Sequence, residues 1–254
     1  MHILILGGTT EARLLGERLV GRDLQLTYSL AGRTQSPLPM PGPVRIGGFG
    51  GAEGLAEYLS AEHIDMLVDA THPYAAAMSR NAADAAAMIG IPFIALHRAA
   101  WTPVAGDSWT EVADAREAVR ALGAVSRRVF LALGRQEIAP FGGAPQHHYL
   151  VRSVDPIDPP LPVPHATYIE ARGPFSEADD RALLDTHRIE VVVSKNSGGN
   201  AAYGKIAAAR ALGLEVILLR RPALPDVPSV GSIAEAIAFI DHALDSGIES
   251  ARPG

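Results

Sequence analysis

Residues 1–15 read Met1-His-Ile-Leu-Ile-Leu-Gly-Gly-Thr-Thr-Glu-Ala-Arg-Leu-Leu15, so an apolar run passes through glycines and threonines directly into an alanine- and leucine-rich stretch. This order of strand, glycine turn and helix places backbone N–H groups at a helix N-terminus, where nucleotide phosphates bind. Thr9 stands where the G-x-G-x-x-G pattern has its middle glycine, so the turn alone is a weak signal and a plain connection is the alternative. We expect the pyrophosphate of a dinucleotide to be surrounded by Gly7, Gly8, Thr9, Thr10, Glu11 and Ala12.

The second apolar run, 26–30, ends at Ala31-Gly32-Arg33. At this place an acidic residue binds the ribose 2′-OH of NADH, whereas an arginine accommodates the 2′-phosphate of NADPH. Gly32 lets the backbone approach the adenine ribose, and Arg33 favours NADPH. A solvated surface arginine is the alternative interpretation.

Composition excludes several classes of protein. With 254 residues, 48% apolar residues and no apolar run long enough to span a bilayer, we expect a cytoplasmic protein without a membrane segment or signal sequence. The absence of cysteine excludes disulfides and thiolate chemistry. A net charge of −6 argues against nucleic acid as the main partner, although a few clustered arginines still suit an anionic small molecule.

Apolar β-branched runs alternate with alanine-rich stretches along the whole chain, which is typical of parallel βαβ units. We therefore predict an α/β fold of two Rossmann-like domains with mainly parallel sheets. The expected strands are 2–6, 25–30, 65–70, 92–96, 129–133, 148–153, 167–171, 190–194, 214–219 and 228–230. The expected helices are 11–21, 52–60, 75–89, 114–122, 177–186, 200–212 and 232–245, and Pro/Gly-rich stretches such as 139–146 are expected to be loops.

The two halves resemble each other. Residues 63–98 can be aligned with residues 188–221, and each copy continues through a proline-containing loop into an extended piece and an alanine-rich helix. Any two βαβ units share such features by composition, but the matched Gly and Arg positions favour a duplication. We expect an N-terminal nucleotide-binding domain over 1–98, a C-terminal domain over 99–245, a flexible tail over 246–254, and a ligand cleft between the domains.

Ligands of open parallel sheets bind beyond the carboxyl ends of the strands. Residues 69–74, Asp-Ala-Thr-His-Pro-Tyr, end one strand, and Pro73 keeps His72 out of the helical region and is expected to start the next helix. Beside a nicotinamide, His72 and Tyr74 are the titratable groups that would orient substrate or deliver a proton. A packing role for His72 is the alternative.

The corresponding loop of the second half, Ser194-Lys-Asn-Ser-Gly-Gly-Asn200, has more polar and glycine residues than a turn requires, which indicates binding of phosphate or carboxylate oxygens. A purely structural loop is the alternative. Further arginines end other strands of this half, and together they would bind a polycarboxylate: Arg135, Arg152 and Arg172. No metal-ligand spacing, nucleophile elbow or P-loop is present.

The motifs, taken in order, resemble the precorrin-6A reductase family of NADPH-dependent enzymes in cobalamin biosynthesis. They are Ile5-Leu-Gly-Gly-Thr-Thr-Glu-Ala12, Ala31-Gly-Arg-Thr34, Arg45-Ile-Gly-Gly-Phe-Gly-Gly51, Asp69-Ala-Thr-His-Pro-Tyr-Ala75, Ser194-Lys-Asn-Ser-Gly-Gly199 and Arg220-Arg-Pro222. The resemblance covers nearly the whole chain. It implies an oxidoreductase with NADPH in the interdomain cleft and hydride transfer to C19 of a polycarboxylate tetrapyrrole, giving precorrin-6B.

The resemblance also suggests roles for the strand-end loops. It implies that Ala70, Thr71, His72 and Pro73 lie by the nicotinamide, and that the second half contributes Ser194, Lys195 and Asn196 to the cofactor and Ser197, Gly198, Gly199 and Asn200 to the substrate. The proton donor stays open between His72, Tyr74, Lys195, a cleft water and a substrate propionate. The alternatives are a reductase of cobalt-precorrin-6A or another polycarboxylate, and a non-catalytic NADPH sensor. We expect a monomer or weak homo-oligomer.

Overall fold

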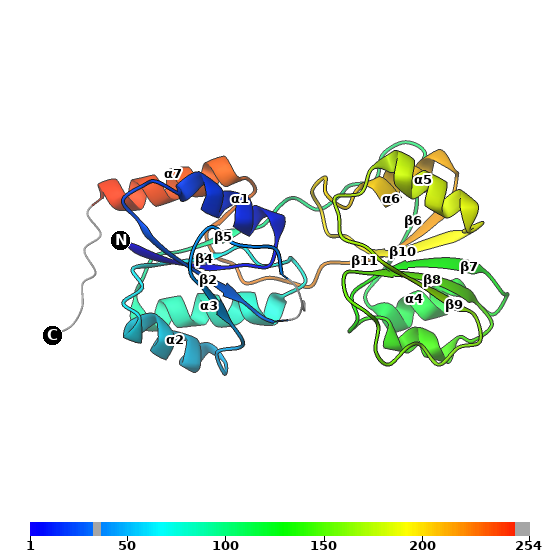
Figure 1. Cartoon of the computed structure of the whole chain (residues 1–254), viewed down its shortest axis with the longest axis horizontal. Coiled ribbons are helices and arrows are strands. Elements are labelled where there is room, and N and C mark those ends of the chain that lie inside the picture. Colours follow the sequence, from blue (N-terminus) through cyan, green and yellow to red (C-terminus); the bar gives the residue numbers. More distant parts are fainter. Residues whose placement is uncertain (33–36, 247–254) are drawn as a thin grey trace. The chain divides into compact units, whose positions relative to one another are not determined.

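The structure is a computed structural model that describes residues 1–32 and 37–246, and the chain divides into two compact units (Figure 1). The first unit comprises Met1–Arg98 together with the chain from Pro222 onward, and the second comprises Ala99–Arg221. Arg33 and residues 247–254 of the expected tail lie outside the described residues. Within the described ranges each unit contains one six-stranded parallel sheet.

The first sheet has the order β12-β5-β4-β1-β2-β3. Its elements are β1 (His2–Leu6), α1 (Thr10–Leu19), β2 (Gln25–Leu30), β3 (Val44–Ile46), α2 (Ala52–Ala61), β4 (Met66–Asp69), α3 (Ala76–Ile89), β5 (Phe93–Leu96), β12 (Ser229–Val230) and α7 (Ile233–Asp245).

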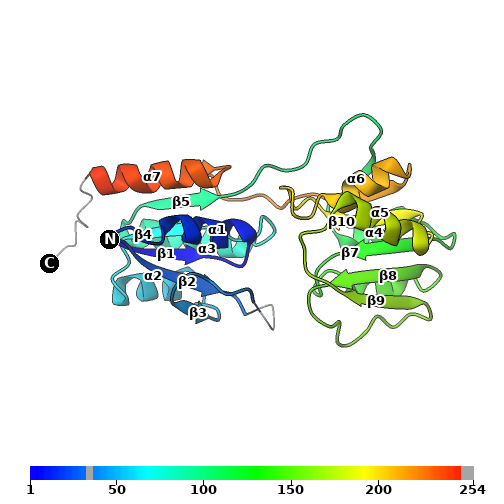
Figure 2. The same ribbon diagram turned by 45° about the horizontal axis from the view of Figure 1, so that its top comes forward.

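Both faces of this sheet are covered by helices, α1 and α7 on one and α2 and α3 on the other (Figures 1 and 2). Successive side chains of a strand point to opposite faces, so β1 supplies both cores. Ile3 and Ile5 pack with the α1 and α7 side, whereas Leu4 and Leu6 pack with the α2 and α3 side. This explains why residues 3–6 of β1 form an unbroken apolar run.

The second sheet has the order β6-β11-β10-β7-β8-β9. Its elements are β6 (Ser108–Val112), α4 (Ala115–Leu122), β7 (Arg128–Ala132), the 3-10 helix η1 (Ala139–Gly143), β8 (His148–Ser153), β9 (Ala166–Glu170), α5 (Glu177–Thr186), β10 (Val191–Lys195), α6 (Gly204–Ala211) and β11 (Glu215–Leu219). Helices α5 and α6 pack together over a core that includes Phe130, Val192 and Ile206.

The duplication inferred from the sequence is visible in the structure, because β4-α3-β5 and β10-α6-β11 occupy the same places in sheets of the same order. The residues aligned at the start of the two copies, His63 and Arg188, are the only non-glycine residues with positive φ in the described chain, at 53° and 51°. Each follows a helix and donates its backbone N–H to a carbonyl three residues earlier. The two turns before the central strands therefore have the same geometry.

The last strand and helix of each copy are exchanged between the units. After β5 the chain leaves the first unit and adds β6 and α4 to the second sheet, and after β11 it returns and pairs β12 with β5. Both exchanged helices begin alike, with Asp114 and Ser232 accepting the backbone N–H of a glutamate at the third helical position. The expected C-terminal domain of 99–245 is therefore corrected, since residues 222–245 complete the first unit.

Most expected elements agree with the structure to within one or two residues. Strand β3 and helix η1 were not expected, and β6 was expected only as an extended piece of the repeat and not among the strands, because β3 has three residues and β6 is largely exposed, which leaves little apolar pattern to detect. Helix α6 begins at Gly204 rather than at residue 200. Among the described residues no helix is both long and apolar enough to cross a membrane.

Candidate functional site

The carboxyl ends of β1, β2 and β4 are neighbours in the first sheet, so the glycine turn after β1, the turn after β2 and the loop after β4 share one edge. Strand order reverses here, because β1 has β2 on one side and β4 on the other. Such a reversal is where ligands bind in open α/β sheets. The expected cofactor residues of the first unit are thus brought together at this edge.

The turn after β1 is built around Thr9. Gly8 adopts φ 101°, and a Cβ added there would meet no atom within 4 Å, so its backbone lies open. Thr9 caps helix α1 by accepting the Ala12 N–H (3.1 Å), while its own hydroxyl donates to the carbonyl of Ala70 (2.7 Å). The Thr9 hydroxyl is thereby already used inside the protein and links the two loops, whereas Thr10 is exposed.

The loop after β4 is fixed by its own side chains. Thr71 is buried and donates both its N–H and its hydroxyl to Oδ1 of Asp69 (3.0 and 2.7 Å). His72 accepts the Tyr74 N–H at Nδ1 (3.3 Å), and the two rings are tilted with centroids 5.6 Å apart. Helix α3 begins at Ala76, later than the expected start at Pro73, because residues 72–75 form a turn closed by the Ala75 N–H on the His72 carbonyl.

Two residues after β5 join this edge, and sequence reasoning missed both. Nε2 of His97 lies 3.4 Å from Oδ2 of Asp69, whose side chain is fully buried. Arg98 forms an ion pair with Glu11 in the first turn of α1 (2.5 Å). Their position directly after a strand could have identified His97 and Arg98, because the same criterion selected the other loops.

Near the turn after β2, Gly32 adopts φ 69° and a Cβ there would meet Ile46 at the end of β3. Arg45 of β3, which was not among the expected site residues, donates to the carbonyls of Gly47 and Gly48 (2.7 and 2.6 Å) and stacks 3.8 Å from the Phe49 ring centroid. Arg45 therefore organises the glycine-rich loop beside the turn that carries Ala31 and Gly32.

In the second unit, residues 194–200 follow β10 and hold other parts of the same unit. Ser194 is buried, and Asn196 makes two hydrogen bonds with the backbone of Trp101, accepting its N–H (2.8 Å) and donating to its carbonyl (2.9 Å). The Trp101 indole donates to the Gly199 carbonyl (2.8 Å). Much of the loop's polarity is therefore used to secure the chain where it enters the second unit.

The departing chain is secured by the same loop. The Arg221 guanidinium donates to the carbonyls of Asn196, Ser197 and Ala99 (2.8, 3.1 and 3.2 Å). Gly198 lies so close that an added Cβ would be 2.1 Å from the Ala99 oxygen. For Asn196 and Gly198 the structure thus supplies a structural role beside the expected ligand role, and Asn200 accepts the Tyr203 N–H with its carbonyl.

Two other cations of this edge, Lys195 and Arg135, have acidic partners. Lys195 pairs with Glu137 (2.5 Å), and Arg135 lies 3.9 Å from Asp155, while Arg172 is exposed in the loop after β9. Arg152 differs from the expectation of an open carboxylate-binding group. Its buried guanidinium is paired with Asp180 of α5 and lies 3.6 Å from the Phe175 ring centroid, so its charge is already neutralised inside the unit.

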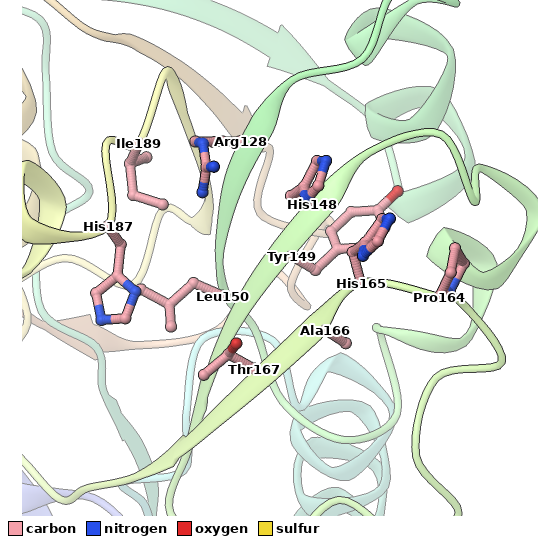
Figure 3. Close-up of a pocket in the computed structure, with 10 residues that line it drawn as sticks. All are labelled: Arg128, His148, Tyr149, Leu150, Pro164, His165, Ala166, Thr167, His187 and Ile189. Atoms are coloured by element: carbon pink, nitrogen blue, oxygen red, sulfur yellow. The ribbon is translucent and has the colours of Figure 1, made fainter.

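A pocket of about 300 Å³ lies at the opposite, amino-terminal ends of β7, β8 and β9 (Figure 3). Arg128, His187 and the stacked rings of His148 and His165, with centroids 4.3 Å apart, line it. None of the residues expected to bind cofactor or substrate belongs to this lining. Across residues 1–32 and 37–246, no group of three or more His, Asp or Glu side chains is arranged to hold a metal ion.

Comparison with known proteins gives consistent matches over nearly the whole chain. A family model described as "Precorrin-6x reductase CbiJ/CobK" matches residues 2–241. A precorrin-6A reductase of Sinorhizobium sp is 58% identical over 243 residues, which cover 95% of this chain and 93% of that protein. One of Rhodobacter capsulatus is 51% identical over 224 residues, covering 88% and 89%. A solved structure, "CobK precorrin-6A reductase", superposes with a TM-score of 0.92 at 46% identity and covers 99% of both chains.

Proposed function

The chain belongs to the precorrin-6x reductase family CbiJ/CobK, and on this basis we propose that the switch-point edge of its first unit binds NADPH as the reductant for precorrin-6A. Its activity is that of a precorrin-6A reductase of cobalamin biosynthesis, as in its close relatives. The predicted fold class is confirmed by the two parallel sheets and by the match to the solved reductase. The observation that carries the cofactor proposal is the open glycine turn at the N-terminus of α1.

The residues of this turn fit a pyrophosphate. The backbone of Gly8 is accessible, and the first N–H groups of α1 point out of the helix toward the edge, where the helix dipole favours negative charge. The Glu11 carboxylate would oppose a phosphate, but its ion pair with Arg98 offsets that charge. We assign Gly8 and Thr10 to backbone or hydroxyl contacts, and Thr9 to holding the turn in shape. The N–H groups of Gly7 and Ala12 already donate to the Ser29 carbonyl (2.9 Å) and the Thr9 hydroxyl (3.1 Å), so these two residues shape the turn.

At the nicotinamide end, NADPH would supply a hydride to C19 of the macrocycle, and a proton added at the neighbouring atom would complete the reduction to precorrin-6B. The chain's contribution is to orient the reactants. The loop between β4 and α3 would form one wall of the nicotinamide site with Ala70, Thr71, His72 and Pro73. Asp69 holds this wall in place by accepting the N–H and the hydroxyl of Thr71. His72 and Tyr74 are the titratable groups placed there.

For the substrate we propose the carboxyl edge of the second sheet. Lys195, Arg135 and Arg172 carry positive charge there, and precorrin carries acetate and propionate carboxylates. The pairing of Lys195 with Glu137 and of Arg135 with Asp155 means that substrate carboxylates would compete with protein carboxylates for these cations.

The cofactor proposal is tested at Arg33. We expect Arg33→Ala to weaken NADPH binding by about 10- to 100-fold and to leave NADH binding unchanged, because a charge-assisted contact to the 2′-phosphate is lost. The control is Arg18→Ala, an exposed arginine in the last turn of α1, which should change neither affinity. Equal affinities of Arg33→Ala and the unmodified protein for NADPH would exclude the assignment.

Turnover is tested by adding purified precorrin-6A to the protein with NADPH and following loss of nicotinamide absorbance. Oxidation with precorrin-6A, and little with cobalt-precorrin-6A, is the expected result. Binding of NADPH without oxidation under either condition would indicate a sensor rather than an enzyme.

The roles at the two edges are separable by kinetics. If His72 or Tyr74 supplies the proton, His72→Ala or Tyr74→Phe lowers kcat, and full turnover of both variants would remove them as acids. We expect Lys195→Ala to raise KM for precorrin and to leave KM for NADPH unchanged. A matched Glu137→Gln variant, which releases Lys195 from its partner, should lower KM for precorrin.

A further inference from the structure

Asp69 is the most deeply buried carboxylate at the proposed cofactor edge, with an exposed fraction of 0%. Its two oxygens have different tasks. Oδ1 accepts the N–H and the hydroxyl of Thr71, which belongs to the loop that follows β4. Oδ2 faces Nε2 of His97, at the end of the neighbouring strand β5, at 3.4 Å. The carboxylate therefore joins the loop to the adjacent strand.

The carboxylate remains ionised in this position. Burial by itself raises the pKa of Asp69, but the favourable contacts of its carboxylate with His97, Ser79 and Thr71 outweigh it, so that the pKa lies below its ordinary value. Ser79 lies on the buried face of α3. Burying an ionised carboxylate costs desolvation free energy. The presence of Asp69 at this position therefore needs an explanation, which its contacts on both sides provide.

His97 stands at a junction of the fold. Its backbone N–H donates to the carbonyl of Val230 in β12, the strand returned from the second half of the chain (2.9 Å). The next residue, Arg98, reaches Glu11 in the turn that we assign to the pyrophosphate. Two successive side chains after β5 thus contact two different loops of the proposed site, His97 through Asp69 and Arg98 through Glu11.

We propose that Asp69 and His97 are positioning residues for the nicotinamide half of the cofactor. The pair holds the loop 70–73 against the end of β5, so that the wall beside the nicotinamide is fixed before hydride transfer. Hydride transfer depends on alignment of the reacting atoms, and a small displacement of this wall is costly. This inference rests on the proposed function. It assigns no role to the pair at the adenosine half, which the proposed function would place toward β2 and β3.

The experiment compares two ligands. NADPH contains the nicotinamide, whereas 2′,5′-ADP has only the adenosine half with its 2′-phosphate. We expect Asp69→Asn and His97→Gln each to raise the Kd for NADPH about tenfold and to leave the Kd for 2′,5′-ADP unchanged, because only the nicotinamide wall is loosened. We expect the double variant to resemble the single variants, since both substitutions break one interaction.

The matched control is Asp180→Asn, the same substitution at a carboxylate of similar burial in the second unit, which should leave both dissociation constants unchanged. Thermal unfolding without ligand identifies variants that fail to fold, and His97→Gln tests the proposal if Asp69→Asn does not fold. Equal weakening of both ligands, or no change in NADPH binding, would overturn the positioning role. Failure of the unmodified protein to bind either ligand would instead overturn the proposed function.

Discussion

At the scale of single residues, many polar side chains at the two sheet edges bind their own protein. The Thr9 hydroxyl donates a hydrogen bond to the Ala70 carbonyl, and the side-chain amide of Asn196 donates one to the Trp101 carbonyl. Buried polar groups require such partners, because leaving one unsatisfied costs about 1–3 kcal/mol. The residue types at a strand end therefore indicate a functional edge. The hydrogen-bond partner of each side chain, however, depends on which other segment of the chain packs against it.

Arg152 illustrates the difference and can be tested. Arg152→Ala leaves Asp180 as a buried carboxylate without its partner, so we expect a loss of about 3–5 kcal/mol in the free energy of unfolding, measured by urea titration. The double variant Arg152→Met/Asp180→Leu should recover most of this loss, since neither charge remains buried. A higher KM for precorrin with unchanged stability would instead support the ligand role expected from the sequence.

The lowered pKa of Asp69 has a consequence for acid stability. The carboxyl stabilises the folded state above its ordinary pKa of 3.8, and this contribution is lost as pH falls through the lower folded-state value. The unmodified protein should therefore be more stable than Asp69→Asn between about pH 5 and 7, and the difference should shrink below about pH 4. Urea titrations across this range measure it, and a difference independent of pH would contradict the assignment.

At the scale of elements, the sequence located the central strands well. Strands β1, β2 and β8 begin and end at the predicted residues. Their buried positions are mostly apolar, as expected for strands with helices or chain on both faces. The β10–α6 loop was different. Its glycines and polar residues indicated a ligand, and the structure shows that they also hold the chain on its way into and out of the second unit.

Gly198 provides a test of this structural role. Gly198→Ala places a Cβ 2.1 Å from the Ala99 oxygen at a φ of 69°, so we expect it to lower the free energy of unfolding by more than 2 kcal/mol, from strain and displacement combined. Gly213→Ala is the matched control, because its φ of 66° imposes the same strain while nothing lies within 4 Å of the added carbon. It should cost only about 1 kcal/mol. Equal losses in thermal or urea unfolding would show that the approach to Ala99 is unimportant.

At the scale of the whole molecule, the exchange of the last strand and helix between the units determines whether each unit is built from one continuous segment of the chain. The second unit is one continuous segment, Ala99–Arg221, whereas the first needs the chain from Pro222 onward. Helix α7 contributes Ala236, Ile240 and Ala243 to the core around Ile3, Ile5 and Leu15. Removing α7 would expose this apolar surface to water.

Fragments should therefore behave differently. We expect residues 99–221 to unfold cooperatively on their own, and residues 1–98 to lack cooperative unfolding because one face of their sheet is uncovered. Joining residues 222–246 to Met1 through a flexible linker should restore cooperative unfolding to the first unit. Circular dichroism with urea measures all three, and a cooperative transition of residues 1–98 alone would contradict the exchange as a stability requirement.

The sequence by itself determined the two parallel α/β sheets, the duplication and the loops that end the central strands, because apolar periodicity and glycine turns are local properties of the chain. Only the tertiary structure decided that residues 222–245 complete the first unit, that His97 faces Asp69, and that Asn196, Arg152 and Thr9 bind within their own units. These outcomes depend on which segments, distant along the chain, satisfy each other's hydrogen bonds and charges. The N-terminal strand and glycine turn thus mark the proposed cofactor edge, and contacts from residues far along the sequence give that edge its shape.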